Sequence, residues 1–575
     1  MANTIESDKI FIKSIFEMWY RIPEYQRPYV WGVDQINDLL DDISFAQQQN
    51  KDSEYFLGSI VFQKKLIKNS DGTEYIENDL LDGQQRLTTL LLLTAVIRDI
   101  TENKTRKITC QKSIFQEANP DDNVPERLRI VFDIRDEVRD FINNYVKEEG
   151  GTKKEDLNDL AQSLKDLSIK NMATAILEMH KYFKNNEISI DDFFPYFRNK
   201  VLMIYVASEE LEDAFKLFTI MNDRGIKLRN SDILKAMNLR EVTDDTKRNN
   251  YAKNWEDIES YFEEDFDVFL SHLRTILVKD KARLNLLDEF EKNIHSPSKY
   301  NRETKTYTKL PPLLNKGEET FKYINKYKQY YIELFDTSHY DQYSSYKLDN
   351  LLTVMKATLP ADFWISPLLR FYDKFKKDRL FEFLKKLDNK FSYDWIIQFT
   401  PTTRIENMAK IISQIDLVQS VDDLFASDVF DVDENKLINI LRDDIYGRRF
   451  ARYVLYKLDY LYSSKDDKMN IPKTISVEHI LPQNPKDGSQ WKKDFTDIQI
   501  DDNKHKIGNL VLISRSKNSS QGNLDYDKKK EKYFQKNIDL FRNSLRILTL
   551  NDTWTPEKLQ ENQKNVIEKL RTYYC

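Results

Sequence analysis

Hydrophobic residues recur at helical spacing along most of this chain, and short apolar runs typical of strands interrupt the pattern. Residues 84–100 predict a helix that buries one broad face. That face carries Leu87, Leu90, Leu91, Thr94 and Ile97. The β-rich segments 56–63 and 201–208, and the residues that lead up to Asp82, predict strands. The first hundred residues therefore mix strands and helices.

The rest of the chain predicts helices, with one polar loop at 295–312 and one long helix over 437–464. A strand–loop–strand–helix pattern follows that helix, and a last helix ends the chain. We therefore expect a predominantly helical α+β protein in three parts. These are an N-terminal domain at 1–240 with an α/β core at about 10–100, a helical middle region at 241–390, and a helical C-terminal domain at 391–575.

Composition narrows the class of protein. Only 12 Gly and 15 Pro in 575 residues favour long helices. The net charge of −7 confines any nucleic-acid surface to a local patch. Two cysteines exclude a disulfide framework and a cysteine zinc site, and they fit a reducing cytoplasm. The longest apolar run, from Leu90, is too short to cross a bilayer, so we expect a cytoplasmic protein without a membrane partner.

The C-terminal strand–loop–strand–helix carries residues suited to phosphodiester hydrolysis. His479 ends the first strand beside Glu478, Asn509 lies 30 positions later in the second strand, and Asn518 follows nine further on. A neutral imidazole is the usual base that activates water near pH 7. Mg²⁺ or Mn²⁺ prefers oxygen ligands, which Glu478 and Asn518 supply, and Asn509 can fix the His479 side chain or its backbone. The alternative is a structural strand-end histidine with two turn asparagines.

The same region is basic in an acidic protein. Residues 503–536 hold nine Lys or Arg against three acids, a balance of +6. The candidate phosphate contacts are Lys506, Arg515, Lys517, Lys528, Lys529 and Lys530. A solvated helix face is the alternative for 528–532, and the patch does not separate DNA from RNA. The other five histidines have no ordered set of partners in the sequence, so we interpret them as structural. They are His180, His272, His295, His339 and His505.

A second cluster joins residues 22–31 with residues 79–90. The Asp82–Gly83 turn leads from a strand into a helix whose first turn carries Gln84, Gln85 and Arg86. A helix N-terminus with an adjacent arginine is a natural phosphate site, and Gln26 and Arg27 add further donors. The alternative is an Arg86 that pairs with a nearby aspartate. Tyr25 and Tyr29 fit either a core or base stacking, whereas Trp31 fits the core.

These motifs together resemble the GmrSD family of modification-dependent (type IV) restriction enzymes. The matching segments are YQRPYVW, FLGSIVF, DGQQRLTTL, FTIMNDRGIKLRNSDILKA and VEHILPQ…IGNLVLISRSKNSSQGN. The resemblance implies a ParB/sulfiredoxin-like N-terminal domain that binds and hydrolyses a nucleoside triphosphate (GTP, ATP, CTP or UTP). It also implies a C-terminal HNH, or His-Me-finger, nuclease domain. A Glu stands before the histidine where many HNH sites have an Asp.

The resemblance also implies roles for single residues. His479 would be the general base and Asn509 the orienting residue, with Asn518 and Glu478 as metal ligands. The implied nucleotide site consists of Tyr25, Gln26, Arg27, Asp82, Gly83, Gln84, Gln85 and Arg86, completed by Asn222 and Arg224.

We therefore expect an NTP-regulated, metal-dependent DNA endonuclease of a prokaryotic anti-phage system that cuts modified foreign DNA. One alternative is a nucleotide-switched DNA-binding protein that does not cleave, and another is an HNH nuclease directed at RNA. A single HNH site cuts one strand at a time, so a double-strand break requires a homodimer or two visits.

Overall fold

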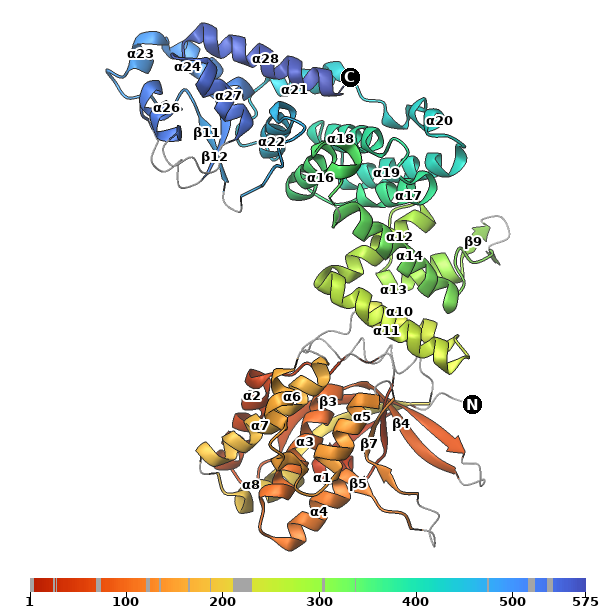
Figure 1. Ribbon diagram of the computed structural model, residues 1–575. Helices are drawn as coiled ribbons and strands as arrows, with labels where there is room; N and C mark the ends of the chain where they lie inside the picture. The colour runs from red at the N-terminus through yellow and green to blue at the C-terminus, as the bar shows by residue number, and fades with distance from the viewer. Residues whose placement is uncertain are drawn as a thin grey trace. The chain divides into compact units, whose positions relative to one another are not determined.

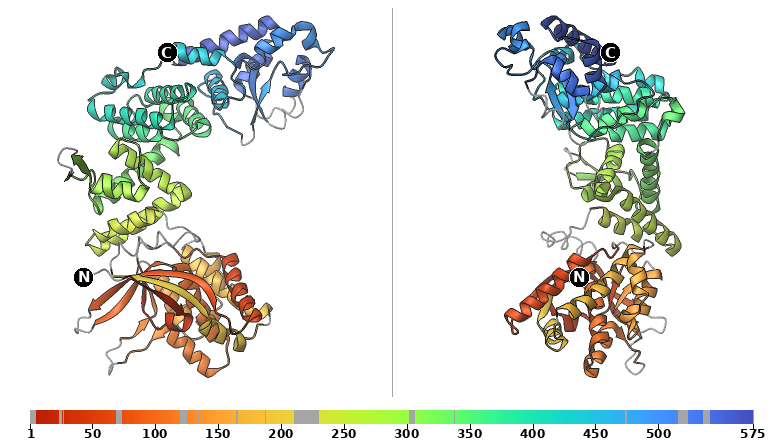
Figure 2. Two further views of the ribbon diagram at one scale, coloured as in Figure 1. Left: turned by 180° about the vertical axis from the view of Figure 1, so that it is seen from behind. Right: turned by 60° about the vertical axis from the view of Figure 1, so that its left-hand side comes forward.

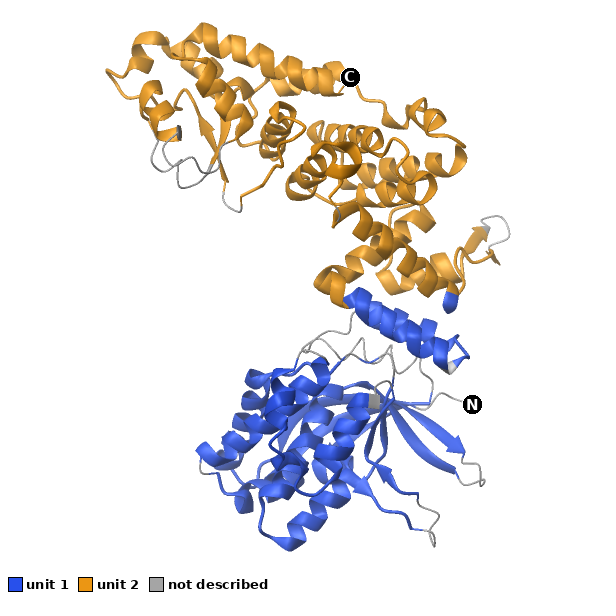
Figure 3. Ribbon diagram, viewed as in Figure 1, with its two compact units in different colours: residues 1–259, 316–318 blue, residues 260–315, 319–575 orange. Residues whose placement is uncertain are grey.

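The chain forms two compact units, which Figure 3 distinguishes by colour. Unit 1 comprises residues 1–259 and 316–318, and unit 2 comprises residues 260–315 and 319–575. The computed structural model describes residues 5–23, 26, 28–68, 74–119, 125–133, 136–163, 166–186, 188–209, 230–301, 306–336, 338–472, 475–514, 523–534 and 541–574. The described residues are mostly helical, with a mixed sheet in unit 1, which confirms the expected α+β class.

A six-stranded mixed sheet organises unit 1 (Figure 1). In spatial order its strands are β1 (Glu6–Phe11), β8 (Val201–Ser208), β3 (Tyr55–Lys68), β4 (Glu74–Asp82), β2 (Tyr20–Ile22) and β7 (Ile130–Phe132). β3 pairs antiparallel with β4 and parallel with β8, and β2 lies parallel to both β4 and β7. The strands predicted at 56–63, before Asp82 and at 201–208 are confirmed as β3, β4 and β8. Because β8 lies inside the sheet, the sheet extends well beyond residue 100.

Helices gather on one face of this sheet, and Figure 2 shows the strands from the opposite side. The α-helices on this face, among the described residues, are α1 (Ile12–Ile15), α2 (Val33–Gln49), α3 (Gln84–Ile100), α4 (Lys104–Ile114), α5 (Asp136–Phe141), α6 (Leu157–Gln162), α7 (Leu167–Asn185) and α8 (Ile190–Asn199). Helix α10 (Asn230–Arg240) and most of α11 (Asp245–Phe262) also belong to unit 1. Helix α3 has the predicted bounds, but it is buried on every side from Leu87 to Asp99 rather than on one face. The reason is that α3 packs against both α4 and α7 and shares one hydrophobic core with the sheet.

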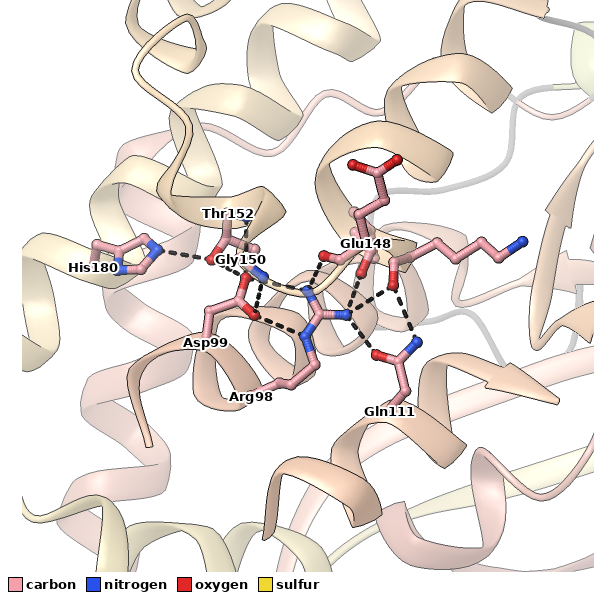
Figure 4. A network of polar contacts seen from close by, with 9 residues as sticks. Arg98, Asp99, Gln111, Glu148, Gly150, Thr152 and His180 are labelled. Atoms are coloured by element: carbon pink, nitrogen blue, oxygen red, sulfur yellow. Dashed lines mark hydrogen bonds and ion pairs between the residues drawn. The ribbon is translucent and has the colours of Figure 1, made fainter. Parts of the chain in front are cut away.

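A buried arginine fixes the C-terminal end of α3 (Figure 4). The Arg98 guanidinium, 1% exposed, donates to the carbonyl oxygens of Val146 and Glu148 and pairs with Asp99 at 2.8 Å. Asp99 in turn accepts the hydroxyl of Thr152 at 2.7 Å. These bonds hold the π-helical segment η2 (Ile142–Lys147) and the turn after it against the core.

Unit 2 is helical apart from two small two-stranded sheets in the described residues. Its first part holds α12 (Phe266–Val278), α13 (Leu286–Glu289), α14 (Glu318–Phe335), α15 (Tyr340–Tyr343), α16 (Lys347–Thr358), α17 (Ile365–Phe375), α18 (Leu380–Ile396), α19 (Pro401–Leu417) and α20 (Val421–Phe425). The stretch predicted as a loop at 295–312 contains a hairpin instead. Its strands are β9 (Ser298–Asn301) and β10 (Thr306–Lys309), which pair antiparallel.

The predicted helix over 437–464 is two helices, α21 (Glu434–Arg442) and α22 (Ala451–Tyr462). The helix is interrupted at residues 443–450, where Gly447 adopts a left-handed φ of 79°. The backbone N–H groups of Ile445 and Tyr446 leave the helical pattern and donate to the carbonyl oxygen of His505. This break brings Tyr446 to the candidate nuclease site.

The remaining elements of unit 2 surround a second hydrophobic core that includes Trp491 and Trp554. They are β11 (Ile475–His479), α23 (Gln490–Asp494), α24 (Asp497–Asn503), η7 (Ile507–Asn509), β12 (Leu510–Ser514), α26 (Tyr526–Phe534), α27 (Arg542–Leu550) and α28 (Pro556–Tyr574). The Trp491 indole donates to Leu524 O at 3.0 Å, so Trp491 anchors the long loop between the two strands.

A buried charged cluster ties α28 to α18 and α22. Lys457 and Asp388 form an ion pair in which neither residue is exposed. The hydroxyls of Tyr453 and Tyr573 donate to the same carboxylate at 2.8 and 3.0 Å. Every group of this cluster therefore has a partner, as the burial of a charge requires.

No helix in the part of the chain that the structure describes is long and apolar enough to cross a membrane.

Candidate functional site

The expected strand–loop–strand–helix is present as β11, β12 and α26. β11 and β12 pair antiparallel, with His479 opposite Leu510 and Glu478 opposite Val511. His479 is the last residue of β11, as predicted from the sequence. Asn509 lies in the 3₁₀ turn η7 directly before β12, rather than inside the strand. The hairpin therefore brings His479 and Asn509 to the same end of the two strands.

Asn509 fixes the backbone beside His479 rather than its side chain. The fully buried Asn509 side chain accepts the N–H of Leu481 at 2.8 Å. Its amide donates to the carbonyl oxygens of Leu481 at 3.0 Å and Lys504 at 2.9 Å. The Asn509 carbonyl also accepts the N–H of Ile480 at 2.9 Å. This set of bonds determines where the chain turns after β11, which corresponds to one of the two roles expected for this residue.

The His479 imidazole is 5% exposed and has a partner at each ring nitrogen. Its Nε2 lies 3.2 Å from Nδ1 of His505, and its Nδ1 lies 3.3 Å from the side-chain amide of Gln483. Burial, followed by the charges of His505 and of two lysines, lowers the pKa of His479 to about 3. The ring is therefore neutral near pH 7, which is the protonation state that a general base requires.

The Glu478 carboxylate does not stand free to bind a metal. Lys529 donates to Glu478 Oε1 at 2.7 Å and to the His479 carbonyl oxygen at 2.6 Å. The Lys529 side chain is 3% exposed and that of Glu478 is 12% exposed. The assignment of Lys529 as a phosphate contact is therefore wrong, because α26 turns this side chain into the protein to neutralise Glu478. Burial lowers the pKa of Lys529, and the Glu478 charge acts in the opposite direction.

The other predicted phosphate contacts fall into three groups. Lys528 is exposed on α26. Lys530 pairs with Asp552 at 3.0 Å, and Lys506 pairs with Asp444 at 3.2 Å, so both are partly neutralised. Arg515 and Lys517, together with the predicted metal ligand Asn518, lie outside the described residues.

The described residues do not form a metal site by themselves. No group of three or more His, Cys, Asp or Glu side chains that could hold an ion occurs among them. Near His479 the candidate ligand is the Glu478 carboxylate, which already has the Lys529 ammonium as its cation. A divalent ion at Glu478 would therefore either share this carboxylate with Lys529 or displace Lys529 from it.

In unit 1 the structure brings Gln26 and residues 28–31 onto the start of α3. The Gln26 amide, 8% exposed, donates to the carbonyl oxygens of Leu80 and Leu81 at 3.0 Å each. Gln85 accepts the N–H of Val30 at 2.8 Å and donates to Pro28 O at 3.0 Å. Both glutamines therefore use their side chains to hold this loop in place. Tyr29 is buried and its hydroxyl bonds Thr89 at 2.7 Å, which makes it a core residue.

The turn before α3 has the predicted shape. Gly83 has a φ of 90°, and an added Cβ would lie 2.4 Å from the Ile60 side chain, so only glycine fits. Arg86 donates to Ser59 O at 2.9 Å, close to Gly58, and thus binds a backbone carbonyl rather than the aspartate considered as the alternative. Asp82 ends β4, and Gln84 is buried in the first turn of α3. Four further predicted residues, Tyr25, Arg27, Asn222 and Arg224, lie outside the described residues.

Two residues that the sequence did not single out lie at the candidate nuclease site. His505, which we interpreted as structural, contacts His479, and Tyr446 lies against both imidazoles. A basic and aromatic break inside a predicted helix, around Gly447, is the signal that could have drawn attention to Tyr446.

Comparison with known families agrees with this architecture. A family model described as GmrSD restriction endonuclease, N-terminal domain, matches residues 8–239, and one described as GmrSD restriction endonucleases, C-terminal domain, matches residues 431–569. No curated protein sequence matches the chain. Two such domains in this order define a restriction endonuclease, a hydrolase that acts on DNA. The chain belongs to the GmrSD family of type IV restriction endonucleases, which confirms the resemblance seen in its motifs.

Proposed function

We propose that this protein is a metal-dependent DNA endonuclease of a prokaryotic anti-phage defence system, regulated by a nucleoside triphosphate and directed at modified foreign DNA. In this proposal β11, β12 and α26 form a ββα-metal (HNH) finger, and unit 1 contains a ParB/sulfiredoxin-like nucleotide-binding core. The observation that supports the nuclease most directly is the position of His479 at the end of β11, paired with β12, in a turn that Asn509 cross-links.

The proposed chemistry uses His479 as the base. Its imidazole takes a proton from a water molecule, and the resulting hydroxide attacks the phosphorus of the scissile phosphodiester. Asn509 holds the backbone turn that aims the ring. When bound, Mg²⁺ or Mn²⁺ would neutralise the charge that develops on the phosphate. Asn518 and Glu478 remain the proposed ligands of that ion, whether Lys529 shares the carboxylate or leaves it.

The proposed nucleotide site is the start of α3. The first N–H groups of a helix have no partner within the helix and attract phosphate. Gly83, in the left-handed conformation, is the N-cap residue of α3, and Arg86 lies in the first turn of this helix. The buried Gln26 and the part-buried Gln85 shape the wall of the site rather than reaching into it. GTP, ATP, CTP and UTP are all candidates.

The test is a cleavage assay with the full-length protein. Modified phage DNA, unmodified plasmid and a structured RNA are each incubated with Mg²⁺ or Mn²⁺, with and without each NTP. We expect metal-dependent cleavage of DNA that changes with one or more NTPs and is greatest on modified DNA. Cleavage of RNA alone would favour the RNA-directed nuclease. Binding and NTP turnover without cleavage would favour the switched DNA-binding protein.

The assay also shows whether the protein cuts one DNA strand or both strands in a single event. A single HNH site gives nicked circles before linear plasmid, whereas a homodimer with two active sites gives linear plasmid directly. The protein-concentration dependence of the linear product therefore tests the proposed homodimer.

A further inference from the structure

A second histidine lies in contact with the proposed general base. Nδ1 of His505 is 3.2 Å from Nε2 of His479, and the two ring centroids are 5.3 Å apart. His505 follows α24, and its carbonyl oxygen accepts the N–H groups of Ile445 at 3.1 Å and Tyr446 at 3.4 Å. The break between α21 and α22 thus fixes the backbone that carries His505.

Tyr446 completes the arrangement from the same break. Its ring lies parallel to His505, at an angle of 7° and a centroid distance of 5.2 Å, and it meets the His479 ring edge-on at 4.2 Å. The bridge between Asp444 and Lys506 holds this segment next to His505. The plane of the His505 ring is therefore set by a packed neighbour as well as by its backbone.

The two partners of His479 define which nitrogen carries its proton. With the Gln483 amide as donor, Nδ1 of His479 is an acceptor. Nε2 then carries the hydrogen and donates it to Nδ1 of His505. In a neutral imidazole this tautomer leaves the Nδ1 lone pair as the basic site. A water molecule that replaces the Gln483 amide would meet that lone pair.

We propose that His505 is a positioning residue of the nuclease: it accepts the Nε2–H of His479 and so directs Nδ1 toward the attacking water. This inference rests on the proposed function, in which His479 is the base. In the step it supports, a water proton passes to Nδ1 and the hydroxide oxygen bonds to phosphorus. The bond from phosphorus to the leaving oxygen breaks, and that oxygen takes a proton from solvent. His479 is thus the base that activates the nucleophile, and His505 is the third group that orients it.

Four variants of the full-length protein test the role. H505A removes the acceptor. H505N places a polar atom near the position of Nδ1, whereas H505Q places it nearer Nε2. D502A, an exposed position on α24, is the matched control. The measurement is steady-state cleavage of the best DNA substrate, with kcat and KM determined separately for each variant that retains the wild-type melting temperature.

We expect H505A to lower kcat by about 10–100-fold with KM changed less than twofold, since orientation of the base acts on the chemical step. H505N should recover most of kcat, H505Q should recover little, and D502A should match wild type. In the H479A background, H505A should have no further effect, because His505 acts through His479.

The inference is overturned if H505A cleaves like D502A, if Gln restores activity better than Asn, or if H505A lowers the residual rate of H479A. These outcomes differ from a failure of the proposed function. A wild-type protein that never cleaves, or an H479A protein that cleaves normally, would overturn both. An inactive H479A beside a fully active H505A would overturn this inference alone.

Discussion

Replacing Lys529 by Met tests whether Glu478 depends on a lysine for its charge balance. The substitution keeps most of the aliphatic volume but removes the ammonium that lies 2.7 Å from Glu478 Oε1 and 2.6 Å from the carbonyl oxygen of His479. Removal of one partner of a buried ion pair costs about 3–5 kcal/mol. Glu478 retains 12% side-chain exposure, so we expect about 3 kcal/mol, at the lower end of that range.

The assay is hydrogen exchange of the full-length protein, read on peptides that cover residues 475–481. A loss of about 3 kcal/mol raises the local opening equilibrium by roughly 100-fold, so exchange in β11 should accelerate by that factor. Lys528→Met is the matched control, because Lys528 is the exposed neighbour on α26. We expect the control to exchange like wild type.

The double variant E478Q/K529M sharpens the test. A neutral glutamine at position 478 needs no cation. The loss of stability in the double variant should therefore be smaller, by about 2 kcal/mol, than the sum of the losses in the two single variants. Mg²⁺ should slow exchange in K529M more than in wild type if the freed carboxylate binds the ion. Equal exchange in K529M and K528M, or strictly additive losses in the double variant, would refute the reasoning.

Three further predictions concern other buried groups. Arg98→Lys should lower the melting temperature and reduce the free energy of unfolding by about 3 kcal/mol. The reason is that a lysine cannot reach the carbonyl oxygens of Val146 and Glu148 and the Asp99 carboxylate together. A melting temperature within 1 °C of wild type, which corresponds to roughly 0.5 kcal/mol, would contradict this prediction. Asn509→Asp should reduce kcat for DNA cleavage and speed hydrogen exchange at residues 480–482, because a carboxylate would then face two carbonyl oxygens. An N509D protein with normal kcat would exclude the orienting role. Burial raises the pKa of Asp459 to about 7, above the value of about 4 in the unfolded chain. The folded state therefore binds this proton more tightly than the unfolded state does. As a result, the free energy of unfolding should fall as the pH rises from about 4 to about 7. Asp459→Asn keeps the acceptor for the Asn543 N–H at 3.0 Å and should remove that part of the pH dependence in denaturant titrations at pH 5 and pH 8; an unchanged pH dependence would contradict it.

Local patterns were sufficient to predict the elements that carry a strong signal. The uninterrupted apolar run of α3, the β-branched run of β8 and the strand that ends at His479 all have the predicted positions. In each case the residues of one segment carry a pattern strong enough to indicate its conformation, although the strands also depend on pairing with distant strands.

Features that depend on distant contacts could not be predicted in the same way. Helical periodicity continues through residues 443–450, but bonds to the carbonyl oxygen of His505 and the left-handed Gly447 break the helix there. A lysine at position 529 has the same sequence signal as its exposed neighbour Lys528, and only the packing of α26 on β11 separates them. His505 likewise gains its partner through the fold, 26 residues away from His479.

The most direct measurement of the central claim is the single-turnover rate of DNA cleavage by wild type, H479A and H180A under the same metal and NTP conditions. His180 is a part-buried histidine of unit 1 bonded to Thr152, so H180A controls for the loss of an imidazole away from the nuclease site. The account predicts that H479A loses at least 100-fold in rate while its melting temperature and DNA binding stay unchanged, and that H180A cleaves like wild type. Equal cleavage rates for H479A and H180A would contradict the assignment of His479 as the base.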